Sequence, residues 1–380
     1  MGSLVLDPFL VADWDKRLLA HPRASAFHTR LWAQVISGTY GHQPVNVGKL
    51  ENDKFISLLP IMEINSWLTG RRGVSLPFSD FCEPLMNESS AGPDLLDSAL
   101  QIGRKRGWKY FEWRGDGLAD DAVPAASLYG HVINLDADEE RLFERLSSPV
   151  RRAVRRAEKL GVEVRFRTDL EAVRNYYALH CTTRRRHGLP PQPFAFFRKI
   201  QEHILAEGNG VVALARLGTG QTEKAGLLGE HSDPEIAPVN LDSTAGTDDP
   251  STGTGGQAFA GAIFFQFGRQ AVYKFGAGDQ SFQDLRGNTL IMWRAMQRFR
   301  NRGVETLHLG RTGPGQGGLR RYKLGFGARE LPIRYFQYDL QEERFRAPRD
   351  LSTGWHNRIF RNLPSRVNRL IGELIYPHLD

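Results

Sequence analysis

Hydrophobic and polar positions follow the same order of elements twice along the chain. IGRKRGWKYFEWRGD (residues 102–116) and RFRNRGVETLHLGRTG (residues 298–313) each read as the end of a basic amphipathic helix, a short strand and a Gly/Arg turn. The glycines that stop the two helices, Gly107 and Gly303, are 196 residues apart. This spacing predicts either an internal duplication or a coincidence of common elements.

The segments before each copy also match. The pattern predicts a hairpin of two strands over 45–64 and three further strands. One of these covers 211–217, and the other two lie within 261–277 and are joined at Gly268-Arg269. Helices are expected over 94–106 and 289–302. Each copy then reads strand, strand, helix, strand, so we expect an α/β (α+β) fold with mixed sheets.

Basic residues concentrate between the copies. Residues 151–200 hold thirteen Lys/Arg and four Asp/Glu. A helix is predicted over 139–160, broken near Pro149, with Arg151, Arg152, Arg155 and Arg156 on one side. Such a face is either simply solvated or binds a phosphate-rich ligand.

Two later segments differ from the rest. Residues 218–257 are half Gly, Ser, Thr or Pro with seven acids and one Lys, which predicts a disordered insertion. The tail is predicted to be a basic amphipathic helix with Pro364 inside its pattern; it either docks on the fold or lies on an anionic membrane. We therefore expect domains at 1–140 and 141–345, the second catalytic, followed by a C-terminal basic helical tail at 346–380.

Composition narrows the function classes. The 380 residues are 41% hydrophobic with a net charge of +7, as expected of a globular protein with an anionic partner. The two cysteines do not form a CxxC motif and the eleven histidines do not form an HExxH motif, so we expect neither disulfides nor a metal site. There is no signal peptide pattern and no run of about 18 apolar residues, so a cytoplasmic location is expected.

The stretch GRTGPGQGGLRRYKLGFGA (residues 310–328) contains seven glycines, four cations and a GxGxxG. A strand precedes it, but a dinucleotide site also needs a following helix and strand with an acidic residue, and no GK[ST] is present. Glycines permit close backbone approach, and free N–H groups beside cations bind anions. The stretch is therefore either an anion-binding loop or a solvated turn.

HPRASAFHTRLWAQVISGTYGHQP, VRRAVRRAEKLGVEV, VYKFGAGDQSFQDLRGNTLIMWRAM and HLGRTGPGQGGLRRYKLGFGA together resemble the FemAB-related branch of the GNAT acyltransferase superfamily, from about residue 21 to 340. The resemblance implies tandem GNAT-like domains that transfer an acyl or aminoacyl group to an amine of a peptidoglycan precursor or envelope glycan. The co-substrate would be an acyl-CoA or an aminoacyl-tRNA, with no tightly bound cofactor. The acceptor would be a phosphate-bearing or lipid-linked precursor.

The family's aromatic-Lys-x-x-Phe-Gly motif matches YKLGFG (residues 322–327), which implies that Lys323 lies at the reacting carbonyl and stabilises the oxyanion. Asp279, His308 or water is the expected base. Candidate substrate-binding residues are Arg311, Gly315, Gly317, Gly318, Arg320, Arg321, Tyr322, Tyr273, Arg152, Arg155, His28 and Trp32. For Tyr273, His28 and Trp32, core packing is the alternative.

Two departures leave the donor open. The long helical hairpin of tRNA-using relatives is missing, and Leu285–Thr289 matches the CoA pyrophosphate loop poorly. A groove between the two halves, floored by the 310–328 stretch, is expected. Rival hypotheses are a non-catalytic RNA-binding protein that uses residues 151–200, and a membrane-peripheral scaffold that uses the tail.

Overall fold

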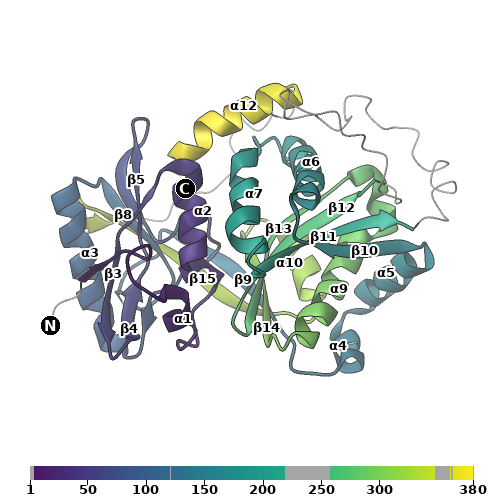
Figure 1. Cartoon of the computed structure of the whole chain (residues 1–380), viewed down its shortest axis with the longest axis horizontal. Helices are drawn as coiled ribbons and strands as arrows, with labels where there is room; N and C mark the ends of the chain where they lie inside the picture. Colours follow the sequence, from purple (N-terminus) through teal and green to yellow (C-terminus); the bar gives the residue numbers. More distant parts are fainter. Residues whose placement is uncertain (1–3, 120, 219–256, 347–359, 361–362, 380) are drawn as a thin grey trace.

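The computed structural model describes residues 4–119, 121–218, 257–346, 360 and 363–379 (Figure 1). The predicted insertion at 218–257 and the first part of the predicted tail lie almost wholly outside these residues. Strands are β1 Leu4–Leu6, β2 Gln43–Pro44, β3 Asn46–Glu51, β4 Lys54–Leu59, β5 Met62–Ser66, β6 Gly70–Val74, β7 Leu85–Met86, β8 Tyr110–Arg114, β9 Ala126–Asn134, β10 Val162–Arg167, β11 Gly210–Leu217, β12 Ala260–Phe267, β13 Gln270–Gly278, β14 Thr306–Thr312, β15 Arg329–Asp339 and β16 Arg344–Phe345. Helices are α1 Trp14–Leu18, α2 Arg30–Tyr40, α3 Gly92–Arg106, α4 Glu139–Arg145, α5 Ser148–Lys159, α6 Leu170–Arg186, α7 Phe194–Ile200, α9 Gly287–Asn301, α10 Gly317–Leu324 and α12 Ser365–Ile375.

The duplicated unit is present in the structure. In the first repeat, β5 and β6 form an antiparallel hairpin, and β6 pairs in parallel with β8 across α3. In the second, β12 and β13 form the hairpin and β13 pairs in parallel with β14 across α9. The hairpin predicted within 45–64 is present as β3–β4, but it belongs to a separate four-stranded sheet. The strand pair equivalent to β12–β13 is β5–β6, which begins at Met62.

The two repeats exchange their last strands. β9 follows β8 in the chain but pairs with β14, whereas β15 follows β14 but pairs with β8. β9 and β15 also pair with each other along seven residues, Arg329–Tyr335. One sheet, from β10 to β2, therefore runs through both repeats. The domain limits at 140 and 345 stay predictions.

The sheet of the second repeat separates two cores. Along β11, Val211, Ala213 and Ala215 belong to the cluster under α5 and α9, whereas Val212 and Leu214 face α6 and α7. This alternation is that of a strand buried on both faces. Because apolar side chains cover both faces, the sheet holds the ends of β13 and β14 in fixed positions.

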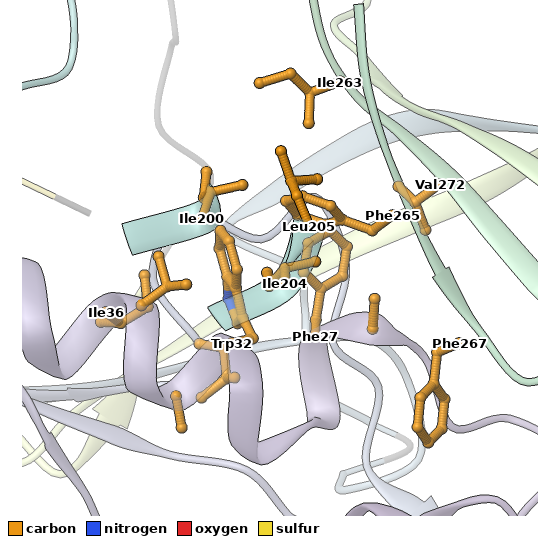
Figure 2. Packing of buried hydrophobic residues seen from close by; sticks show 14 of the residues in the cluster. Phe27, Trp32, Ile36, Ile200, Ile204, Leu205, Ile263, Phe265, Phe267 and Val272 are labelled. Carbon is orange, nitrogen blue, oxygen red and sulfur yellow. The ribbon is translucent and has the colours of Figure 1, made fainter. Parts of the chain in front are cut away.

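The repeats share a core rather than facing each other across a groove. Figure 2 shows Phe27, Trp32 and Ile36 from the first half packing against Ile200, Ile204 and Phe265 from the second. Trp32 and Phe265 are fully buried, with ring centroids 5.6 Å apart. The two halves are therefore joined by a buried core in which α2 packs on α7.

Two further helix predictions can be compared with the structure. The helix expected over 139–160 is broken into α4 and α5, and Pro149 stands in the first turn of α5, where its missing N–H costs nothing. The tail helix α12 begins directly after Pro364. Among the described residues, no helix combines the length and apolar character needed to cross a bilayer.

Candidate active site

The glycine-rich stretch forms the end of β14, a turn and the eight-residue helix α10. No parallel strand follows α10, because β15 pairs antiparallel with β8 and β9. The GxGxxG is therefore not part of a dinucleotide-binding unit.

The glycines of this stretch serve different purposes. Gly310 and Gly327 have φ of +70° and +76°, a region that other residues avoid. Gly325 packs closely, since a Cβ there would lie 2.9 Å from Val150. At Gly315, Gly317 and Gly318 a Cβ would meet nothing within 4 Å, so these three glycines border open space, and the cradle expected from them stays a prediction.

Lys323 points into the protein from α10. It is 4% exposed, and its Nζ donates a hydrogen bond of 2.8 Å to the carbonyl of Arg311. Burial lowers the pKa of Lys323 to about 8, although Asp80 counteracts part of this change. The side chain is thus held at the end of β14. Because it is removed from water, its charged ammonium form is destabilised relative to the neutral amine.

The strands beside Lys323 separate. β13 and β14 pair only from Gln270 to Val272, although β13 continues to Gly278 and β14 to Thr312. No other described strand pairs with this edge of Tyr273–Gly278, because β12 occupies the opposite edge. An unpaired strand edge presents backbone N–H groups to whatever enters the opening.

A cavity of about 280 Å³ lies at the end of this opening, where β13 stops and α9 starts. It is bounded by the beginning of β12, the end of α6 and Tyr322 of α10. Its lining comprises Arg186, Phe259, Ala260, Gly278, Asp279, Gln280, Phe282, Gln283, Arg286, Gly287, Asn288, Thr289 and Tyr322. The cavity is thus inside the second repeat, and not between the halves as expected.

The amino end of α9 faces this cavity. Arg286 precedes the helix with a φ of +58° and makes no side-chain cap. The amides of Thr289 and Leu290 bond back to its carbonyl, and no bond within the described residues uses the amides of Gly287 and Asn288. Free N–H groups and the helix dipole favour an anion here, and Arg186 and Arg286 add two cations.

Three predicted residues lie at or beside the cavity. Tyr322 lines it, and its hydroxyl donates to the carbonyl of Asn288 at 3.2 Å. Asp279 lines it too, but its Oδ1 accepts from both the amide and the hydroxyl of Ser281. Tyr273 lies on β13 within the opening, and burial raises its pKa to about 12, so it keeps its proton at neutral pH. The role of Asp279 as a base stays a prediction.

A buried ionic cluster closes the other side of the opening. Asp80, from the loop after β6, accepts from Nζ of Lys274 at 3.1 Å and lies 3.7 Å from Arg311. Burial works against its ionisation, but Lys274 and Arg311 hold the pKa of Asp80 below its usual value. The nearby Gly310 could not become alanine without crowding this carboxylate, since the Cβ would lie 3.3 Å from it.

His308, the other candidate base, is neutral. Burial lowers its pKa to about 3, and Phe81 covers the ring with centroids 4.1 Å apart. Its Nδ1 accepts the amide proton of Gly310 at 2.9 Å, so the neutral ring carries its own proton on Nε2. In this tautomer neither nitrogen is free to take a further proton.

The predicted arginines differ in their contacts, and Arg155, although exposed, stacks over the ring of Phe143 at 5.3 Å from its centroid. Arg320 forms two bonds of 2.6 and 2.8 Å with Glu330, and Arg311 donates to the hydroxyl of Tyr335 at 2.6 Å. Arg321 is exposed. Arg152 and Arg155 are exposed on α5, outside the cavity lining.

His28 and Trp32 are core residues, which corrects their assignment to substrate binding. His28 is 3% exposed, its Nδ1 caps a short helix through Ser25, and its Nε2 contacts the carbonyl of Glu83 at 2.8 Å. Trp32 is fully buried. Neither side chain can reach a ligand without opening the core.

Sequence reasoning missed most of the cavity lining, including Arg186 and Phe259, and found Leu285–Thr289 only as a poor match to the CoA pyrophosphate loop. The available signal was positional: a glycine follows a strand end and opens a helix in the second repeat, the usual place for an anion. The consensus of the CoA pyrophosphate loop did not identify this place, because the chain makes the backbone turn at Arg286 with a different sequence. No group of three or more His, Cys, Asp or Glu suited to a metal occurs among the described residues.

Comparisons with known proteins show what the sequence and the fold are similar to. Residues 145–229 and 252–324 match the family model of the acetyltransferase (GNAT) domain. The crystal structure of FemX superposes with a TM-score of 0.62 at 15% identity, covering 88% of this chain and 96% of FemX. A tandem GNAT protein from the clavulanic acid biosynthesis pathway covers 92% of this chain and 99% of its own, with a TM-score of 0.49 and 10% identity. The C-terminal domain of a putative lysylphosphatidylglycerol synthetase from Agrobacterium fabrum has a TM-score of 0.48 at 13% identity, covering 85% of this chain and 91% of its own. No curated protein matches the sequence.

Proposed function

We propose that the chain is an acyltransferase related to the FemAB branch of the GNAT superfamily, and that it transfers an acyl group from an acyl-CoA to an amine; the GNAT family match and the FemX-like fold support this. The observation that carries this proposal is the cavity at the amino end of α9. Its two free amides and two arginines suit the diphosphate of the donor. The GNAT family match favours acyl transfer over the rival hypothesis of a non-catalytic RNA-binding protein.

In this proposal the donor enters along the opening between β13 and β14. The diphosphate binds at Gly287 and Asn288, and the thioester lies near Tyr273 and Tyr322. A cavity of about 280 Å³ holds only part of an acyl-CoA, so the nucleoside lies outside, near the start of α9. An aminoacyl-tRNA would have to place its phosphates on the same two arginines.

The chemistry needs no covalent enzyme intermediate. The amine nitrogen attacks the thioester carbon, the C–S bond of the tetrahedral adduct then breaks, and CoA leaves as a thiolate. The negative charge that develops on the carbonyl oxygen is stabilised by the free amides of β13 and by the ammonium of Lys323. The proton lost by the amine returns to the leaving sulfur, directly or through water.

The acceptor is proposed to be an amine of a phosphate-bearing envelope precursor, as the resemblance to the FemAB-related branch implies. Arg321 is exposed beside Tyr322 and carries no partner among the described residues, so it is the candidate for the acceptor's phosphate. An envelope glycan or a lipid-linked precursor would both supply such a group.

A binding and turnover experiment tests the proposal. Acetyl-CoA and longer acyl-CoAs should raise the melting temperature of the protein, and release of free thiol should require an amine. Arg286→Ala should raise the KM for the acyl-CoA about tenfold, the value of one charge-assisted hydrogen bond, with kcat little changed. Arg269→Ala serves as the matched control, since Arg269 is exposed at the β12–β13 turn and lies outside the cavity lining. No binding of any acyl-CoA, or an equal effect of both substitutions, would refute the donor assignment.

A further inference from the structure

The last helix, α12, is fixed to the protein along one face. Asn368 is 2% exposed on this face, and a Cβ at Gly372 would overlap the carbonyl of Pro191. The hydroxyl of Tyr376 accepts from Arg184 at 2.7 Å and donates to the carbonyl of Pro190 at 3.2 Å. The tail is therefore held on the end of α6 by packing and by hydrogen bonds.

The residues after α12 bind the first repeat. Arg72 and Thr69, at the turn of the β5–β6 hairpin, both donate to the carbonyl of His378, Arg72 at 3.0 Å. The ring of His378 contacts the hydroxyl of Ser66 at 3.0 Å and the indole of Trp67, whose centroid is 5.3 Å away. The tail thus joins the hairpin tip and α12 into one surface.

This surface exposes large apolar side chains, and we name it the α12–hairpin surface. Figure 1 shows α12 along the same edge of the molecule as the projecting β5–β6 hairpin. The exposed fractions are Trp67 85%, Leu68 58%, Val367 41%, Leu370 57%, Leu374 64% and Leu379 41%. Those on α12 recur at i, i+3 and i+7, so they form one stripe opposite the docked face. Apolar residues gathered in this way mark a binding surface.

Cations border the stripe. Arg71 and Lys109 lie beside the turn of the hairpin: Arg71 donates to the carbonyl of Arg106 at 2.9 Å, and the Lys109 side chain packs on Gly70. Arg366 is exposed on α12. No carboxylate of the described residues pairs with any of these three. Glu373 is the acid exposed on α12.

We propose that the α12–hairpin surface docks on an anionic lipid bilayer, with Trp67, Leu370 and Leu374 in the interface. Exposed Trp and Leu beside unpaired cations match the apolar boundary and the charged headgroups of such a membrane. Eleven residues are too few to span it, so α12 lies in its plane. A second copy of the chain fits less well, because the same cations would face each other.

This docking goes beyond acyl transfer and has a consequence for it. Tyr376 binds Arg184, and Arg186, two residues further along α6, lines the cavity. The end of α6 is therefore shared by the tail and by the cavity. A protein docked through this surface would hold the cavity close to the bilayer, where a lipid-linked acceptor is presented.

Vesicle co-sedimentation tests the proposal. The full chain should bind vesicles containing about one third phosphatidylglycerol, and weakly those of phosphatidylcholine alone. Trp67→Ser, Leu370→Ser and Leu374→Ser together should lower binding at least tenfold. Leu10→Ser with Leu19→Ser is the control, since these exposed leucines precede and follow α1 in the chain, and Figure 1 shows α1 at the edge opposite α12. Arg71→Gln with Lys109→Gln should lower binding several-fold and weaken its salt dependence.

Three results would overturn the proposal: no binding of the wild type to anionic vesicles, unchanged binding of the triple variant, or equal loss in the control. A further result would assign the surface to contact between two copies of the chain: the wild type does not bind vesicles and is a dimer in sedimentation velocity, whereas the triple variant is a monomer. Acyl transfer to a water-soluble amine should be the same in the triple variant and the wild type. That assay separates a failure of docking from a failure of the proposed function.

Discussion

Replacing Lys323 with methionine should change how stability depends on pH. Burial lowers the pKa of Lys323 from 10.5 to about 8. Between these values the unfolded chain keeps a proton that the folded protein has released, so raising the pH favours folding. The folded protein therefore bears the full cost of the buried ammonium below pH 8 and loses that cost by pH 10.5.

The magnitude follows from the two pKa values. A gap of roughly 2.5 pH units, at about 1.4 kcal/mol per unit, corresponds to about 3 kcal/mol. Methionine keeps the length of the side chain and carries no proton. The difference in free energy of unfolding, wild type minus Lys323→Met, should therefore rise by about 3 kcal/mol from pH 7 to pH 10.5.

Urea denaturation at several pH values measures this difference, and the other titrating groups cancel between the two proteins. Lys159→Met is the control: it replaces an exposed lysine on α5 and shows how the loss of a surface lysine changes the free energy of unfolding with pH. A difference for Lys323→Met that stays constant with pH would refute the buried position of the ammonium. In activity assays the same variant should lose about a hundredfold in kcat, the usual cost of one oxyanion donor.

Three further substitutions test particular contacts. Gly287→Ala should destabilise the protein by about 1–3 kcal/mol, because its Cβ would lie 2.5 Å from the ring of Phe259; chemical denaturation measures this, and a neutral result would contradict the tight packing at the cavity. Gly318→Ala should leave turnover unchanged and stabilise α10 by up to about 1 kcal/mol, since a Cβ there meets nothing; lost activity would support the glycine cradle. Asp80→Asn should cost about 3–5 kcal/mol by leaving Lys274 buried without its partner, and thermal unfolding of Asp80→Asn with Lys274→Met should show recovery; no recovery would place the cost elsewhere.

Local patterns in the sequence were enough to predict the repeated helices and the β12–β13 turn. The helix expected over 94–106 is α3, and the one over 289–302 is α9, within two residues at each end. Glycines at positive φ, such as Gly107 and Gly303, end or follow these helices and explain why their limits were clear. Periodicity and stop signals act over a few residues, so they can be recognised without knowledge of the fold.

Contacts between distant residues were beyond the sequence. The exchange of β9 and β15 depends on pairing across about 200 residues, for which neither strand carries a local signal. The glycines at 315, 317 and 318 drew attention as a group, yet the chain places them at an exposed helix start. Leu285–Thr289 was located as the counterpart of the CoA pyrophosphate loop, but its poor match to the consensus hid the open amino end of α9. Lys323 was found only through its motif, and its burial required the packing of α10 on β14.

Hydrogen exchange with and without CoA tests the assignment of the donor cavity most directly. Bound CoA should slow exchange of the amides of Gly287 and Asn288 and of those along β13 from Tyr273 to Gly278. Slowing confined to the α5 face or to the tail would contradict the account, as would a saturating ligand that leaves the start of α9 unchanged.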